Sequence, residues 1–186
     1  MKLKKLIYVS MFATIMGVLG MMPPIFIGIS PVPITLQSLG VMLAGSVLGA
    51  RFGAKYAALS QILFLSLVIA GLPLLSGGRG GIGVLVGPSA GYLLGYVAGA
   101  FVIGWFAYRL KEGKFMRLLL INLFGGIFVV YLFGIPIQAF MMNISLVEGM
   151  LTSLVFLPGD ITKVVVASIL AVKLMNVAPF RKEVSA

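Results

Sequence analysis

An aspartate and a lysine three positions apart, Asp160 and Lys163, stand inside an otherwise apolar stretch near the C-terminal end of the sequence. Residues at positions i and i+3 of a helix share one face, so a carboxylate and an ammonium group would lie side by side. The carboxylate accepts hydrogen bonds and the ammonium group donates them, which would let the pair bind a small polar molecule. The simpler alternative is a local ion pair in which Asp160 also caps a helix that starts after Pro158-Gly159.

Arg79 is the third charged candidate, and it stands among the glycines 77, 78, 80, 81, 83 and 87. A glycine backbone folds tightly and approaches a ligand closely, so we expect a loop that covers a ligand, presents Arg79 and contacts the ligand at Gly81. The alternative is a flexible outer loop whose Arg79 meets lipid phosphate. Together Arg79, Asp160 and Lys163 carry a net charge of +1. This set suits a small molecule with one carboxylate and a polar group that bears N–H.

Four uncharged polar residues are weaker candidates for ligand contact. Thr35 and Gln37 follow the proline-rich segment 31–34, and Tyr92 and Asn143 lie at the ends of apolar stretches. Polar groups in membrane helices usually face the protein interior. Gln37 has the alternative role of a polar residue at a helix end.

Several catalytic and cofactor sites are excluded. The chain has no Cys and no His, and its only acids are Glu112, Glu148, Asp160 and Glu183, so neither a catalytic set nor a metal site is expected. Residues 78–83 match G-x-G-x-x-G, but a dinucleotide site needs a preceding strand and a βαβ unit. No P-loop motif occurs, so any dependence on ATP would require another subunit.

The composition is that of an integral membrane protein. Soluble domains carry about 25% charged residues, whereas only 10% of these 186 residues are charged and 61% are hydrophobic. The net charge of +10 would favour nucleic acid as the partner of a soluble protein. Here the cations flank apolar stretches, so membrane topology and anionic lipid explain them, and no nucleic-acid partner is expected.

The apolar stretches predict an all-α fold with six transmembrane helices. We expect these helices over residues 6–22, 35–49, 54–71, 89–108 and 117–141, and from just after Asp160 to Met175. Residues 1–186 would form a single six-helix membrane domain, and residues 72–88 would form a glycine-rich outer loop between the third and fourth helices. The fifth helix is long enough to tilt or to break near Gly134-Ile135-Pro136.

The positions of the cations predict the direction of each crossing. Cytoplasmic segments collect Lys and Arg, so both termini are expected to be cytoplasmic. A signal peptide over residues 6–22 is disfavoured, because no A-x-A-like site follows it and its removal would break the charge alternation. The cations in the terminal segments and in every second break are Lys2, Lys4, Lys5, Arg51, Lys55, Arg109, Lys111, Lys114, Arg117, Lys173, Arg181 and Lys182.

Glycines recur every four residues at positions 87, 91, 95 and 99. Small residues at this spacing let helix backbones approach closely in a membrane. We expect this stripe to pack inside the bundle, with a dimer face as the alternative.

Three segments taken together resemble the BioY family of biotin transporters. They are residues 31–37 (PVPITLQ), 77–92 (GGRGGIGVLVGPSAGY) and 158–163 (PGDITK), and their order and spacing match over essentially the whole chain. The resemblance implies the S component of an energy-coupling factor (ECF) transporter, a prokaryotic six-helix plasma-membrane protein that binds biotin on the outer side. It also implies a transmembrane coupling (T) subunit and two cytoplasmic ATPases as partners, with no cofactor on this chain.

The resemblance also implies roles for individual residues. Asp160 would accept N–H groups of the biotin ureido ring, and Lys163 or Arg79 would pair with the biotin carboxylate. S components of this class tend to carry a small-x-x-x-small motif on the first helix for docking the coupling subunit. The nearest match here is Ala13 to Gly17, which departs from Ala-x-x-x-Ala.

Three other functional classes remain as alternatives. A stand-alone secondary transporter or channel for another small organic anion would need no ATPase, so uptake in cells without coupling ATPases would identify it. An intramembrane enzyme would lack the usual catalytic residues. A purely structural membrane protein would leave Arg79, Asp160 and Lys163 without a purpose.

Overall fold

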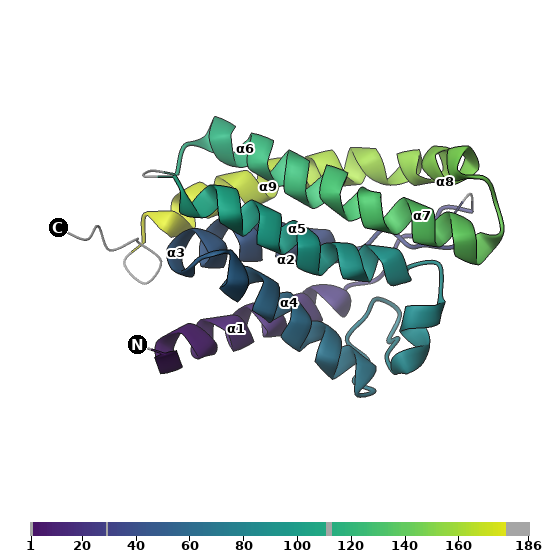
Figure 1. The fold of residues 1–186 in the computed structure, drawn as a ribbon, viewed down its shortest axis with the longest axis horizontal. Coiled ribbons are helices and arrows are strands. Elements are labelled where there is room, and N and C mark those ends of the chain that lie inside the picture. The colour runs from purple at the N-terminus through teal and green to yellow at the C-terminus, as the bar shows by residue number, and fades with distance from the viewer. Residues whose placement is uncertain (1, 29, 111–112, 178–186) are drawn as a thin grey trace.

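The computed structural model describes residues 2–28, 30–110 and 113–177, without the side chain of Lys2 (Figure 1). Lys111, Arg181 and Lys182, which belong to the predicted cytoplasmic segments, lie outside the described residues, as do Glu112 and Glu183. The described part of the chain is helical and contains two isolated β-bridges, Ile25 with Ile34 and Leu75 with Arg79. The predicted all-α class is therefore confirmed.

The helices follow one another with few interruptions. The α-helices are α1 (Lys2–Gly20), α2 (Gln37–Leu43), α3 (Ala50–Phe52), α4 (Ala54–Ile69), α5 (Ala90–Tyr108), α6 (Phe115–Leu123), α7 (Val130–Met142), α8 (Leu146–Ser153) and α9 (Leu157–Met175). Two π-helical segments, Ala44–Gly49 and Phe124–Val129, join α2 to α3 and α6 to α7. Short 3₁₀ turns cover Ile82–Val86 and Leu154–Phe156.

Four helical stretches in the described residues are long and apolar enough to cross a membrane: Leu3–Gly20, Ala90–Tyr108, Phe115–Met142 and Leu146–Met175. The α4 helix is apolar but has 16 residues. At 1.5 Å per residue it is about 24 Å long, shorter than a hydrocarbon core of about 30 Å. Residues 37–52 form another continuous helical run of similar length.

Helix α5 crosses the middle of the bundle and is the most buried of the four long helices (Figure 1). Its glycines allow the neighbouring backbones to come close. A Cβ atom on Gly95 would lie 2.8 Å from the Val130 carbonyl oxygen, and one on Gly99 would lie 2.7 Å from the Gly125 carbonyl oxygen. Gly91, Gly95 and Gly99 thus pack inside the bundle as predicted, whereas Gly87 has open space around it.

Local backbone chemistry sets several helix boundaries. Gly53 adopts φ 101° between α3 and α4, a conformation that favours glycine. Asn143 adopts the left-handed conformation (φ 55°) and ends α7. The Ser145 hydroxyl and the Glu148 carboxylate then form a capping box that starts α8. Residues 146–153, which lie between the predicted fifth and sixth helices, are therefore a helix.

Two expected features of the long helices are corrected. Helix α7 continues through Pro136, and the irregular segment lies earlier, at Phe124–Val129. There a side chain on Gly125 or Gly126 would collide with Ile103 or Met42, so tight packing accompanies the π-helical turn. Helix α9 begins at Leu157 and already includes Pro158 and Asp160, so it starts earlier than expected.

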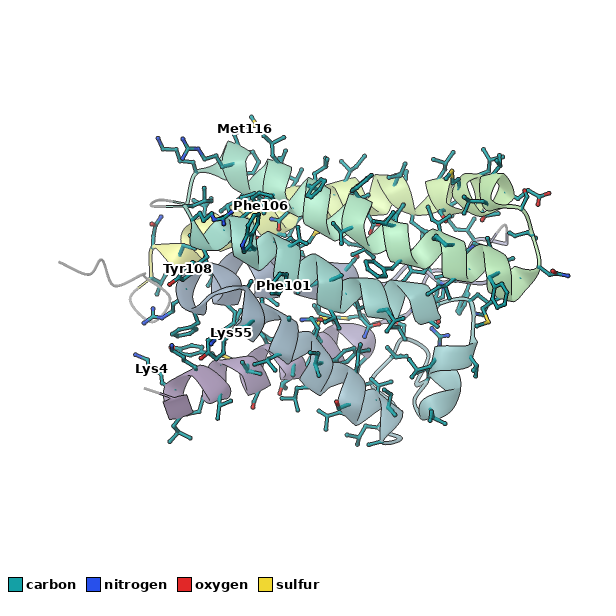
Figure 2. The ribbon with its side chains drawn as sticks, viewed as in Figure 1. Lys4, Lys55, Phe101, Phe106, Tyr108 and Met116 are labelled. Carbon is teal, nitrogen blue, oxygen red and sulfur yellow. The ribbon has the colours of Figure 1, made fainter. Side chains whose placement is uncertain are left out.

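Helix α1 begins and α9 ends at the same end of the bundle, which we call the N-terminal end (Figure 1). Lys4 and Lys55 lie at this end, together with Tyr108 at the end of α5 (Figure 2). The end of α7 and the whole of α8 lie at the opposite end (Figure 1).

Candidate functional site

A cavity of about 600 Å³, part of it open to solvent, lies among α2, α5, α7, α9 and the loops before α2 and α5. Residues from distant parts of the sequence line it: Val32, Thr35, Gln37, Ser38, Leu75, Arg79, Tyr92, Tyr96, Tyr131, Phe156, Asp160 and Lys163 among them. Arg79, Asp160 and Lys163 therefore share one cavity.

Asp160 and Lys163 form a buried ion pair in the wall of this cavity. The Lys163 Nζ atom lies 2.8 Å from Asp160 Oδ1, and the two residues are only 7% and 6% exposed. The Ser38 hydroxyl on α2 connects them, because it accepts from Lys163 Nζ (3.0 Å) and donates to Asp160 Oδ1 (3.1 Å). The Tyr131 hydroxyl on α7 donates to Asp160 Oδ2 at 2.8 Å. Asp160 thus holds three helices together, and it is not the N-cap of α9, which is Phe156.

This network limits what the pair can still bind. A carboxylate offers about four lone-pair sites; Asp160 uses two on Oδ1 and one on Oδ2, which leaves one on Oδ2. An ammonium group has three N–H donors, and Lys163 uses two, on Asp160 and Ser38. The pair therefore offers one acceptor beside one donor. This pattern matches a ligand edge that carries an N–H next to a carbonyl oxygen.

Arg79 reaches the cavity from the glycine-rich loop between α4 and α5. Leu75 and Arg79 pair across a tight turn in which Gly77 and Gly78 have φ values of 80° and 70°. The guanidinium group donates to the Ser76 carbonyl oxygen at 3.2 Å. Arg79 is exposed, unlike Asp160 and Lys163, so a cation stands at the mouth of the cavity. The G-x-G-x-x-G match spans this loop and the following 3₁₀ turn and has no strand before it.

Thr35, Gln37 and Tyr92, which the sequence suggests as ligand contacts, also line the cavity. The Gln37 side-chain amide donates to the Leu74 carbonyl oxygen at 3.3 Å, which ties α2 to the glycine-rich loop. The Tyr92 hydroxyl donates to Gln138 Oε1 at 2.7 Å and lies 2.9 Å from Ser153 Oγ. Gln37 and Tyr92 therefore support the wall with their polar atoms.

Two other ligand candidates, Asn143 and Gly81, and the two predicted docking residues, Ala13 and Gly17, do not line this cavity. Asn143 ends α7 and is exposed, and Gly81 donates its backbone N–H to the Val68 carbonyl oxygen, so neither lines the cavity. Ala13 is 2% exposed within the core, and Gly17 packs against Leu74, where its added Cβ would lie 3.3 Å from a side-chain carbon. The predicted docking pair thus faces inward in this structure.

Sequence reasoning missed Ser38, Tyr96, Tyr131 and Phe156, which complete the cavity. The Tyr92 ring packs edge-on against Tyr131 and Phe156, each with 6.0 Å between ring centroids. Tyr131 had a usable signal, because a tyrosine hydroxyl within an apolar helix needs a hydrogen-bond partner. The sequence indicated Ser38 more weakly, only because it directly follows the candidate Gln37.

The cavity thus combines aromatic walls, a buried acceptor–donor pair and a cation at the mouth. This arrangement suits a small molecule with an apolar body, a polar head and an anionic tail. In the described part of the chain, no three acidic side chains lie close enough together to hold a metal ion.

Comparison with known proteins identifies clear relatives. A profile of the BioY family matches residues 1–180. The probable biotin transporter BioY of Bacillus subtilis is 48% identical over 94% of this chain and 91% of its own length. The biotin transporter BioY of Rhizobium etli is 44% identical over 91% of this chain and 92% of its own length. A crystal structure of the S component for biotin from an ECF-type ABC transporter superposes with a TM-score of 0.88 at 36% identity, covering 96% of this chain and 94% of the other.

Proposed function

This chain belongs to the BioY family, and on that premise we propose that it is the biotin-binding S component of an ECF-type importer. It is a transport protein and not an enzyme. Relatives named as biotin transporters cover nine-tenths or more of this chain, which supports a common ligand.

The single observation that carries this proposal is the acceptor–donor pair at Asp160 and Lys163 in the same cavity as Arg79. A cyclic urea presents N–H and C=O side by side. We place one ureido N–H on Asp160 Oδ2 and the ureido oxygen on the remaining N–H of Lys163. The biotin carboxylate then lies at the mouth near Arg79, because Lys163 has no second free donor. The other ureido N–H needs an acceptor other than Asp160.

We further propose a single domain of six membrane spans over residues 1–186, with both termini cytoplasmic in a prokaryotic plasma membrane. The glycine-rich loop between α4 and α5 then faces outward, so biotin enters from outside. The cations Lys4 and Lys55 at the N-terminal end support this direction (Figure 2). The shorter α4 and residues 37–52 would complete the six spans with help from flanking loop residues.

Import requires partners, since this chain has no P-loop for ATP. We propose a transmembrane coupling subunit and two ATPase subunits, in keeping with the neighbour's description as part of an ECF-type ABC transporter. Biotin uptake should then stop in cells that lack the coupling ATPases. Continued uptake would instead identify a stand-alone transporter.

Calorimetric titration of the detergent-purified protein with biotin tests the ligand. We expect saturable binding of one biotin per chain. A folded protein that binds no biotin would contradict the proposal.

A further inference from the structure

A second cluster of charged and aromatic side chains lies at the N-terminal end, and none of its residues lines the cavity described above. The Lys5 Nζ atom of α1 lies 5.1 Å from the ring centroid of Tyr56 and 6.0 Å from that of Phe52. Lys55 Nζ of α4 lies 5.2 Å from the Tyr56 ring, and the Arg51 guanidinium carbon lies 5.1 Å from the Phe52 ring. Cations at these distances are attracted to the ring faces. Three helices thus hold their cations around two rings.

Among the residues that the structure describes, no carboxylate neutralises the two lysines of this cluster. The carboxylates of the described residues are those of Glu148 and Asp160; Asp160 pairs with Lys163, and Glu148 is bonded within its capping box. Within residues 2–28, 30–110 and 113–177, neither Lys5 nor Lys55 forms an ion pair with a carboxylate. Lys55 is exposed and Lys5 is half-buried, so an anion can reach both.

An apolar track runs from this cluster along α4. Leu59 and Ile62 follow Lys55 at i+4 and i+7, so all three lie on one helix face. Leu59 is 40% exposed and Ile62 is 45% exposed. On α1, the neighbouring helix, Leu6 and Ile7 are also exposed. A cationic end that continues into an apolar face matches a molecule with an anionic head and a long acyl chain.

We propose that Lys5 and Lys55, held by the rings of Phe52 and Tyr56, bind the headgroup phosphate of an anionic phospholipid whose acyl chain lies along Leu59 and Ile62. The apolar track favours a lipid over an acidic protein segment. An acyl chain packs against exposed leucine and isoleucine side chains, whereas an acidic segment would gain nothing from contact with them. Lipid binding at this cluster requires only that the helices lie in a membrane. It stands whether or not biotin is the ligand.

Native mass spectrometry of the detergent-purified chain tests this site with added phosphatidylglycerol. We expect the double variant Lys5→Gln/Lys55→Gln to bind phosphatidylglycerol about 30-fold more weakly, which is a factor of about five for each lysine. The matched control is Lys114→Gln/Lys173→Gln, which removes two exposed lysines outside the cluster. The control should lose clearly less affinity for phosphatidylglycerol than the cluster variant, because Lys114 and Lys173 are not among the lysines that contact the Phe52 and Tyr56 rings. Phosphatidylcholine should bind weakly to every variant, because it carries no net negative charge.

A second variant, Tyr56→Leu, keeps every charge and removes one ring. It should also weaken phosphatidylglycerol binding while leaving biotin binding unchanged. The proposal is overturned if the control loses as much as the cluster variant, since the attraction would then be delocalised. It is also overturned if inorganic phosphate binds as well as the lipid. Loss of assembly with the coupling subunits while lipid binding is unchanged would assign the surface to a protein partner.

Discussion

The Asp160–Lys163 pair allows structural and ligand-binding roles to be separated. Asp160→Asn removes the negative charge but keeps the size of the side chain. It leaves the Lys163 cation buried without its partner, and breaking a buried pair in this way costs about 3–5 kcal/mol of folding free energy. Weak biotin binding by the single variant would therefore be ambiguous.

The double variant Asp160→Asn/Lys163→Met resolves that ambiguity, because a neutral pair of similar volume often restores stability. We expect its thermal unfolding to return close to that of the wild type. Biotin binding should not return, because each lost charge-assisted hydrogen bond is worth about 1.5–3 kcal/mol. One such bond from Asp160 corresponds to a Kd raised about 10- to 150-fold, and the loss of the Lys163 donor adds to it.

Calorimetry with biotin and a thermal unfolding scan measure both quantities on the same samples. Glu148→Gln is the matched control, since Glu148 is exposed, lies outside the cavity and can keep its capping role as glutamine. Its biotin affinity should equal that of the wild type. If the double variant also binds biotin with wild-type affinity, the pair is only structural and our placement of the ureido ring is wrong.

Three further predictions concern the mouth, the helix packing and the carboxylate partner. Arg79→Gln should weaken biotin binding about tenfold or more, as measured by calorimetry. The affinity for a neutral biotin amide should stay unchanged in the same assay. Equal losses for both ligands would contradict the pairing of Arg79 with the biotin carboxylate. Gly99→Leu should lower the free energy of unfolding by about 1–3 kcal/mol through overpacking against Gly125. The control is Gly87→Ala, whose added methyl group meets open space, so the midpoint of its chemical denaturation should be nearly unchanged. Tyr131→Phe should lower the free energy of unfolding by about 1–3 kcal/mol, because Asp160 Oδ2 loses a buried hydrogen-bond donor. An unchanged midpoint of chemical denaturation would show that this hydrogen bond contributes little to stability.

The sequence alone predicted the helical membrane class, because long apolar runs with few charges have few other solutions. It also singled out Arg79, Asp160 and Lys163 as candidates, since charges are costly inside a membrane, and the structure places all three at one cavity. Ser38 and Tyr131 were missed because their role depends on the packing of α2 and α7 against α9, which spacing along the chain does not reveal. Asn143 ends α7 and does not line the cavity, because a polar residue at a helix end serves the backbone as readily as a ligand.

Gln37 and Leu74 connect the rim of the cavity to the end of helix α1. The loop carbonyl of Leu74 accepts from Gln37, and the Leu74 side chain packs on Gly17 near the end of α1. The same carbonyl oxygen lies so close to Gly20 that no Cβ would fit there. The rim of the cavity and the end of the first helix therefore contact each other closely at Leu74, so a shift of one would change the contacts of the other.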